Sequence, residues 1–360
     1  MPLFPEPKDW LMRNALALLA PSLLAIASCS GGDSSGGGNP PPVATVTPTP
    51  TPSVSPTPTP TPVPSASPTP TGTDFLSRAA ALYTVQPDIA ACQAGTLHPA
   101  VTASLLTSLN NVRALHRLPP VVYSPSDEAS AQQSALIMAA NGQLSHTPPA
   151  SWACYSSLGA SGAAASNLYG GVGTGLTLLS EEQIVAGFMT EINNLVIESV
   201  GHRRWLLDPF LGSVAYGRVA GRYQTSNRAD AAAIKVFNLV GPSGPSGALP
   251  AIVAYPYEEY PARFFDTNAL LSFSVISNTT SKFGNTNVNF SGATISVRVR
   301  GGAALTVSRV AYDNEGYGLP NNLQFAVAGL TANTIYDVTI SNVIVAGTPR
   351  SYSYYFRIVA

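Results

Sequence analysis

A long run of small and turn-forming residues near the N-terminus decides which part of the chain can fold. Residues 30–73 read SGGDSSGGGNPPP and then a series of Thr-Pro repeats, with almost no large apolar side chains. Such a segment buries too little apolar surface to offset the entropy of ordering it. Gly and Ser make its first part flexible, and the Thr-Pro repeats favour extended polyproline II, so about 35 residues would span on the order of 100 Å. We therefore expect a stalk here and a globular part that begins near Asp74.

The residues before the stalk have the pattern of an export signal. Lys8 and Arg13 flank the start of the apolar run ALALLAPSLLAIAS, which is short for a bilayer-spanning helix and ends in small residues. Cys29 follows, and the residues IASC resemble a bacterial lipobox, in which the cysteine thiol is lipidated. Residues 1–28 are then a signal peptide that is removed, and residues 29–73 are the lipidated cysteine and its stalk. An ordinary secretory signal with an incidental cysteine is the alternative.

The remaining cysteines and the charge bear on the compartment and the partners. Cys92 and Cys154 are the two cysteines left after Cys29, and disulfides persist in exported proteins. We predict that they pair, which on the chain-entropy estimate stabilises the fold by about 4 kcal/mol; two free buried thiols are the alternative. The net charge is −1 and only 10% of the residues are charged, so nucleic acid is not an expected partner.

Three helices are predicted after Asp74. In residues 100–118 apolar side chains recur every three or four positions, and Pro119 and Pro120 end the pattern. Residues 124–144 begin with a Ser-Asp-Glu cap signal and stop at Asn141-Gly142. Residues 180–192 carry a capping-box pattern. Its residues are Ser180 and Gln183 for the box, with Ile184, Phe188 and Ile192 on the buried face.

After Gly212 the apolar period becomes that of strands. The segments SVAYGRVAGRY and AAIKVFNLVG flank a polar connection and predict an antiparallel pair. The sequence GPSGPSG, residues 241–247, breaks the pattern and predicts a boundary between a first domain, 74–247, and a second domain, 248–360. From about Ala251 onward every segment reads as a short strand, which favours a small all-β sandwich.

Several motifs between Leu105 and Leu239 together resemble one known family. They are LNNVRALHRL with the Ala-rich helix after it, the histidine at His146, SNLYGG, and VGHRRWLLDP followed by SVAYGRV. They resemble the CAP superfamily, the cysteine-rich secretory proteins, antigen 5 and pathogenesis-related proteins, and in particular its bacterial members. The resemblance implies an α+β fold in which a CAP-like α-β-α sandwich precedes the small all-β sandwich.

The same resemblance names candidate site residues. In this family two histidines and two glutamates commonly line a central cleft. By position His146 and His202 match the histidines, Asn167 matches a cleft asparagine, and Ser166 replaces the first glutamate. Two residues lie near the second glutamate without a clear register, Glu191 and Glu198. His146, His202, Glu191 and Glu198 are the catalytic candidates.

The missing glutamate changes what the cleft can do. A carboxylate pair beside histidines supports general-base chemistry, whereas two histidines still offer neutral nitrogen ligands to Zn²⁺ or another divalent metal. Metal binding by His146 and His202 therefore survives the substitution better than hydrolysis does, and no other cofactor is expected. A purely structural role for either histidine stays open.

Four further residues are given structural or surface roles. His98 and His116 are expected to be solvated. Of Arg203 and Arg204, one is expected to cover Trp205 or to pair with Asp208 or Glu198, while the other faces solvent.

Three functions follow from these patterns. The first is a lipid-anchored protein of the bacterial cell envelope, in the periplasm or at the surface, that binds an unknown envelope protein, lipid or glycan without catalysis. The second is a metal-assisted, peptidase-like hydrolase that uses the histidine pair. The third is an adhesion or assembly protein that works through the β-sandwich. The membrane is the expected partner of lipidated Cys29.

Overall fold

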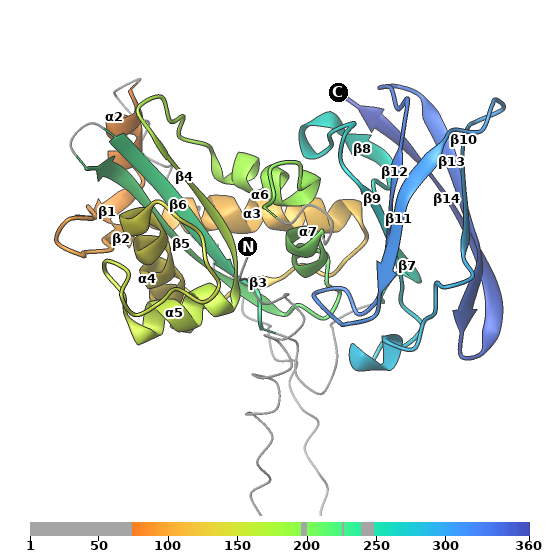
Figure 1. The fold of residues 1–360 in the computed structure, drawn as a ribbon, viewed down its shortest axis with the longest axis horizontal. Coiled ribbons are helices and arrows are strands. Elements are labelled where there is room, and N and C mark those ends of the chain that lie inside the picture. The colour runs from red at the N-terminus through yellow and green to blue at the C-terminus, as the bar shows by residue number, and fades with distance from the viewer. Residues whose placement is uncertain (1–73, 196–199, 225–226, 239–247) are drawn as a thin grey trace, which may run out of the picture. The chain divides into compact units, whose positions relative to one another are not determined.

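The computed structural model describes residues 74–195, 200–224, 227–238 and 248–360 (Figure 1). The predicted signal peptide, Cys29, the stalk, Glu198 and the predicted boundary at 241–247 lie outside the described residues. All of the described residues belong to one compact unit, Pro62–Ala360. Within these ranges, none of the helices has the length and apolar character needed to cross a bilayer.

The predicted helices are present at nearly the predicted bounds. After the short helix α2 (Phe75–Ala80) and the hairpin of β1 (Tyr83–Val85) and β2 (Thr96–Leu97) comes α3 (Pro99–Leu115). Helix α4 (Pro125–Asn141) ends at Gly142, whose φ of 61° is the left-handed conformation that favours glycine. A shorter helix, α5 (Ser157–Ala164), follows it. His98 is not simply solvated, because its Nδ1 accepts a hydrogen bond from the Ala100 amide and caps α3.

A four-stranded sheet lies between two layers of helices. Its order is β3 (Val122–Tyr123), β5 (Ser213–Tyr223), β6 (Asn227–Lys235) and β4 (Ser166–Gly173), and β5 and β6 are the predicted antiparallel pair. Side chains alternate between the two faces. Ala215, Ala231 and Ala233 pack with α4 in one hydrophobic cluster, whereas Val214, Tyr216 and Ile234 belong to the cluster of α3 and α6.

Small residues allow α4 to lie directly on the sheet. A Cβ atom on Gly217 of β5 would come within 2.2 Å of the Ala131 carbonyl carbon of α4, so only glycine fits there. Beside it the Gln132 side chain donates to the Arg218 carbonyl at 2.9 Å and accepts from the Arg218 amide at 2.9 Å. Gly217 of β5 and the small side chains of α4 therefore allow the short distance between this helix and the sheet.

Helix α6 (Glu181–Thr190) has both hydrogen bonds of the predicted capping box, between Ser180 and Gln183. It stops two residues earlier than expected. Glu191 adopts a left-handed conformation with φ 60°, so Ile192 lies outside the helix and is 37% exposed, which corrects its assignment to the buried face. Helix α7 (Gly201–Leu206) then carries the residues GHRRWL.

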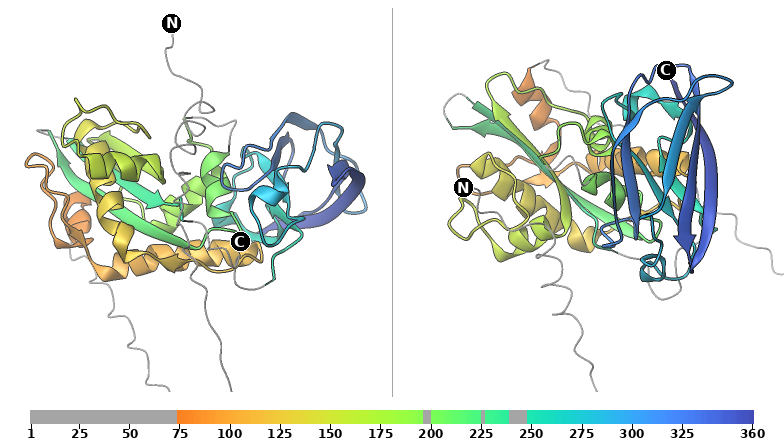
Figure 2. Two further views of the ribbon diagram at one scale, coloured as in Figure 1. Left: turned by 90° about the horizontal axis from the view of Figure 1, so that it is seen from below. Right: turned by 45° about the vertical axis from the view of Figure 1, so that its right-hand side comes forward.

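Residues 248–360 form the predicted all-β region, in which two four-stranded sheets pack face to face (Figure 2). One sheet has the order β11 (Val307–Asp313), β12 (Asn322–Val327), β9 (Leu271–Val275) and β7 (Ile252–Tyr255). The other has the order β10 (Thr294–Val299), β13 (Ile335–Val345), β14 (Thr348–Val359) and β8 (Glu258–Pro261). Most pairs are antiparallel; β8 runs parallel to β14. Two short 3₁₀ turns, Ala262–Phe264 and Phe283–Asn285, connect strands.

The all-β region shares a hydrophobic core with the helical layer. One cluster of buried side chains runs from Leu105 of α3 and Phe188 of α6 through Leu206 of α7 to Val253 and Phe273 of the sandwich. Burial of this kind contributes about 25 cal/mol per Å² of apolar surface. Residues 74–238 and 248–360 therefore stabilise each other.

Two arginines of α7 extend this junction, and neither faces solvent as expected. The Arg203 side chain is fully buried, lies 3.7 Å from the centre of the Tyr255 ring, and donates to the Leu270 carbonyl at 2.7 Å. Arg204 is 2% exposed and makes two hydrogen bonds to the Asp313 carboxylate, at 2.7 and 2.8 Å. Buried guanidinium groups need such planar partners, and here the sandwich supplies them.

Asp208 and His116 lie at the same junction and also differ from expectation. The Asp208 carboxylate pairs with Lys282, not with an arginine, at 2.7 Å, and the Lys282 ammonium lies 4.6 Å from the centre of the Trp205 ring. His116 is not solvated but 2% exposed, with Nδ1 2.9 Å from the Ala254 carbonyl oxygen. Desolvation lowers the pKa of His116 to about 3, so this imidazole is neutral in the folded protein.

Candidate functional site

The end of α6 and the start of α7 bring Glu191 and His202 together. The Glu191 side chain is 2% exposed, and one of its oxygens, Oε2, lies 3.1 Å from His202 Nδ1. The other oxygen, Oε1, accepts the Arg203 backbone amide at 2.8 Å. Asn194 also donates its side-chain amide to Oε2. Among the residues that the structure describes, Glu191 is thus the carboxylate next to His202.

The backbone at Glu191 pays a conformational cost for this arrangement. A left-handed conformation costs a residue with a Cβ atom about 1–2 kcal/mol. Here it turns the carboxylate back toward α7, where three donors meet it. Burial by itself would raise the pKa of the Glu191 carboxyl, but the charge and hydrogen bond of His202, together with Arg203, outweigh burial and hold the pKa below its ordinary value. Glu191 is therefore a buried carboxylate anion.

His146 lies in the connection between α4 and α5. Its Nδ1 lies 2.9 Å from the carbonyl oxygen of Ala163, near the end of α5. The residue is exposed to solvent, yet the protein around the ring desolvates it enough to lower the pKa of the imidazole. The Ala163 hydrogen bond opposes this shift, and the charge of His202 lowers the pKa further. The two histidines therefore lie near enough for the charge of one to act on the other.

The segment that carries His146 is fixed at its far end. The predicted disulfide between Cys92 and Cys154 is present, with the two Cα atoms 5.1 Å apart. Ala153, the residue before Cys154, is held by the side chain of Asn141. This side chain donates to the Ala153 carbonyl and accepts from the Ala153 amide, each at 3.0 Å. These links attach the connection between α4 and α5 to the helix that precedes it and to residue 92.

Ser166 and Asn167, the first residues of β4, point to opposite faces of the sheet. The Ser166 hydroxyl donates to the Gly162 carbonyl at 2.7 Å, on the α5 side. The Asn167 side chain donates to the His202 carbonyl at 3.0 Å and so holds the first turn of α7. Asn167 therefore joins the Glu191 and His202 group directly, whereas Ser166 is engaged with α5.

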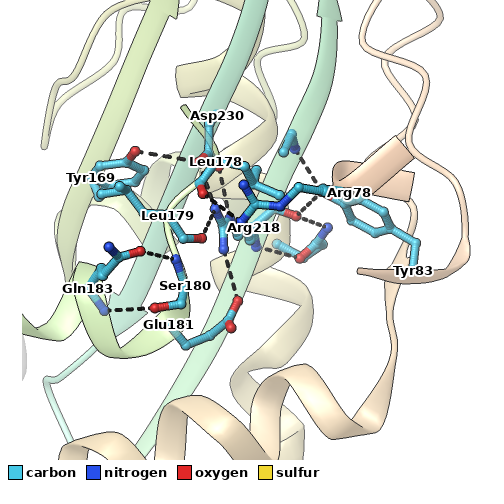
Figure 3. A network of polar contacts seen from close by, with 12 residues as sticks. Arg78, Tyr83, Tyr169, Leu178, Leu179, Ser180, Glu181, Gln183, Arg218 and Asp230 are labelled. Carbon is cyan, nitrogen blue, oxygen red and sulfur yellow. Dashed lines mark hydrogen bonds and ion pairs between the residues drawn. The ribbon is translucent and has the colours of Figure 1, made fainter. Parts of the chain in front are cut away.

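A second set of buried charges was not foreseen from the sequence (Figure 3). Arg218 of β5 makes two hydrogen bonds to Asp230 of β6, at 2.7 and 2.8 Å, and one to Glu181 at 2.8 Å. Because Glu181 is the first residue of α6, this network fixes the helix whose other end leads into Glu191. The signal was available, since charged residues in an otherwise apolar strand pair are buried only when they are paired.

The donor set can be compared with what a metal requires. Both histidines have Nδ1 next to an acceptor, the Glu191 carboxylate for His202 and the Ala163 carbonyl for His146. This is the usual surrounding of a metal-binding histidine that coordinates through Nε2. However, the described residues contain no group of three or more His, Cys, Asp or Glu side chains suited to holding a metal.

The comparison with known families agrees with the fold and with this placement. Residues 106–236 match the family model CAP, described as the cysteine-rich secretory protein family. A comparison with curated proteins finds no significant match. The matched segment contains the central sheet, both candidate histidines and Glu191. Residues 106–236 are thus identified as a CAP domain of the cysteine-rich secretory protein family.

Proposed function

We propose that this is a CAP-domain protein of the bacterial cell envelope, attached by a lipid on Cys29, that binds a ligand or partner at His146 and His202 without turning it over. The observation that carries the absence of turnover is the state of Glu191. Both of its oxygens are occupied by protein donors, and the side chain is 2% exposed. A general base must reach the proton that it abstracts, directly or through one water. Glu191 instead acts as a support for His202.

His202 is the residue that this support prepares for binding. In its neutral form, with the Nδ1 proton donated to Glu191, the His202 ring presents Nε2 as a hydrogen-bond acceptor. The side chain is 19% exposed and packs on the Phe188 ring, with the two ring centres 4.7 Å apart. The ring is therefore oriented from two sides. This supports recognition of a ligand that donates an N–H or O–H group.

A metal-assisted hydrolase is the second candidate, favoured by the acceptors beside both Nδ1 atoms. Zn²⁺ in proteins takes about four ligands, so His146 and His202 would supply half of the set. Bound at these two residues, the ion would act as a Lewis acid and lower the pKa of a coordinated water. The protein's own contribution is to hold both imidazoles in the tautomer that a metal requires.

A turnover assay separates binding from catalysis. The full chain, His146→Ala and His202→Ala are incubated with a panel of fluorogenic peptides and p-nitrophenyl esters. We expect no hydrolysis that depends on either histidine. Turnover by the unmodified protein that both variants lose, while their circular dichroism spectra stay unchanged, would overturn the non-catalytic proposal.

A calorimetric Zn²⁺ titration tests the metal candidate. The same two variants are compared with His98→Gln, a control histidine whose ring only caps α3. Saturable binding that His146→Ala and His202→Ala both lose, and that the control keeps, would favour the metal-assisted enzyme. Binding that is absent, or equal in all four proteins, would eliminate it.

Membrane attachment has its own test. Cells that produce the full chain or Cys29→Ser are fractionated into membrane and soluble parts. We expect the full chain in the membrane fraction and the variant in the soluble one. Equal distribution of the two proteins would exclude the lipid on Cys29.

A further inference from the structure

Strand β4 lies at the end of its sheet, with β6 on one side. In the part of the chain that the structure describes, no segment other than β6 makes a backbone hydrogen bond to residues 167–173. An edge strand of this kind presents a row of alternating N–H and C=O groups. The ligand that matches such a row is a second extended peptide, which pairs with the edge as an added strand.

The sequence of β4 leaves room for a second strand. Three of its eight residues, Gly170, Gly171 and Gly173, have no side chain, and Gly170 is exposed. A Cβ atom on Gly173 would meet no other atom within 4 Å, so this position is open, whereas Cβ atoms on Gly170 and Gly171 would come within 2.9 Å of Leu144 and 3.1 Å of Leu176. Glycine weakens a strand and often marks a place where another backbone approaches closely.

A cavity of about 380 Å³ opens beside the same glycines. Its lining comes from the end of α4 and the residues after it, from β4 and β6, and from Leu195. Met138, Leu144, Val172, Leu195 and Ala231 supply most of its apolar surface, Gln143 and the backbone supply polar surface, and no charged side chain lines it. Leu195 is 82% exposed and Val172 is 43% exposed. Exposed apolar side chains gathered at a cavity are typical of binding sites.

We propose that β4 binds an extended peptide of a partner protein as an added strand, and that one large, uncharged apolar side chain of this peptide fills the cavity. The lining side chains, which are uncharged and apart from Gln143 apolar, favour an apolar side chain, and the edge of β4 favours a peptide over a lipid or a glycan. The inference rests on the proposed function and names the class of ligand that this function requires.

The geometry of β4 relates the cavity to His202. Asn167, which bonds the His202 carbonyl, precedes Gly170 by three residues, or about 10 Å along a strand. Leu168 packs with α4, and Gly170 and Val172 share its side of the strand, whereas Asn167 faces α7. The peptide residue in the cavity and the one next to His202 therefore face opposite sides. An odd number of positions, three in the simplest case, separates them.

A peptide selection provides the test. The full chain with Cys29→Ser, which removes only the lipidation site, is immobilised and challenged with a displayed library of random 12-residue peptides. We expect enrichment of proline-free sequences with Leu, Ile, Phe or Met at one fixed position. Synthetic versions of these peptides are then measured by fluorescence polarisation, and replacing the apolar residue by Asp should lower the affinity at least tenfold.

Variants of both partners make the test specific. Leu195→Asp and Val172→Lys should each weaken binding at least tenfold, whereas Val310→Asp, at a 52% exposed position on β11, should leave it unchanged. In an added strand every second backbone N–H group of the peptide faces β4. Methylation of these nitrogens should abolish binding, whereas methylation of the nitrogens between them should leave it unchanged. The absence of enriched peptides, or affinities that ignore these changes, overturns the proposal. Binding that appears only after residues 30–73 are deleted also overturns it, because the chain's own stalk would then be the occupant.

The outcomes distinguish this inference from the proposed function. If the selected peptides bind as expected but are cleaved in a His202-dependent reaction, the peptide site stands and the non-catalytic function fails. If no peptide is selected and the turnover panel also shows no hydrolysis, the non-catalytic function stands and the peptide site fails.

Discussion

Replacing Arg203 by alanine should weaken the contact between the helical layer and the sandwich and so lower the stability of the protein. The guanidinium donates to the carbonyls of Met189 at 2.6 Å and of Leu270 at 2.7 Å, and to the Ser272 hydroxyl at 3.2 Å. It also lies 3.7 Å from the centre of the Tyr255 ring. Each buried carbonyl left without a donor costs about 1–3 kcal/mol, and a desolvated cation-π contact contributes about 2 kcal/mol.

We therefore expect Arg203→Ala to lower the free energy of unfolding by about 3–5 kcal/mol. The assay is urea unfolding followed by circular dichroism and by tryptophan fluorescence, with Arg350→Ala as a control at an exposed arginine. Since Arg203 joins α6 and α7 to β9, the unfolding transitions seen by circular dichroism and by tryptophan fluorescence should no longer coincide in the variant. A loss below about 1 kcal/mol with a single shared transition would refute the reasoning.

Three further predictions concern the disulfide, a buried histidine and the charged network. Reduction of Cys92–Cys154, which are 62 residues apart, or Cys92→Ser with Cys154→Ser, should cost about 4 kcal/mol, seen as a lower Tm; an unchanged Tm would contradict this. The pKa of His116 is about 3 in the folded protein against an ordinary 6.5, so the unfolded chain binds the extra proton between these values. Stability should fall as the pH drops from 6.5 toward 3, by about 1.4 kcal/mol per pH unit, and His116→Gln should flatten this slope in urea midpoints. Asp230→Ala should cost about 3–5 kcal/mol by leaving Arg218 without its main partner, and Arg218→Met with Asp230→Leu should recover part of the loss in the same assay.

Much of the secondary structure could be predicted because its signals are local. The capping box of α6 lies within four residues, and the glycine that ends α4 lies directly after it. Strand patterns in residues 213–223, from residue 232 and after residue 251 are equally local, and they appear as β5, β6 and the strands of the sandwich. Strand β6 begins earlier than predicted, at Asn227, within the segment expected to be a polar connection. Cys92 and Cys154 could be paired because few alternatives existed once Cys29 was assigned to the anchor.

The roles of the residues in α7 could not be read in the same way. Arg203 meets a carbonyl 67 residues later and Arg204 meets a carboxylate 109 residues later, so no local pattern identifies these partners. His116 was assigned to the surface because it follows a helix, whereas the sandwich buries it against Ala254. The contact of Glu191 with His202 depends on where α6 ends, and the left-handed turn at Glu191 is not encoded by a glycine.

The order of residues in α7 limits how this protein can be divided. His202 faces the candidate site, and the next two residues, Arg203 and Arg204, are anchored in the sandwich. A fragment truncated before residue 248 would expose two cations and the apolar surface around them, directly beside His202. Grafting the CAP domain onto another scaffold, or swapping the sandwich for that of a relative, would therefore alter the binding site as well as the module exchanged.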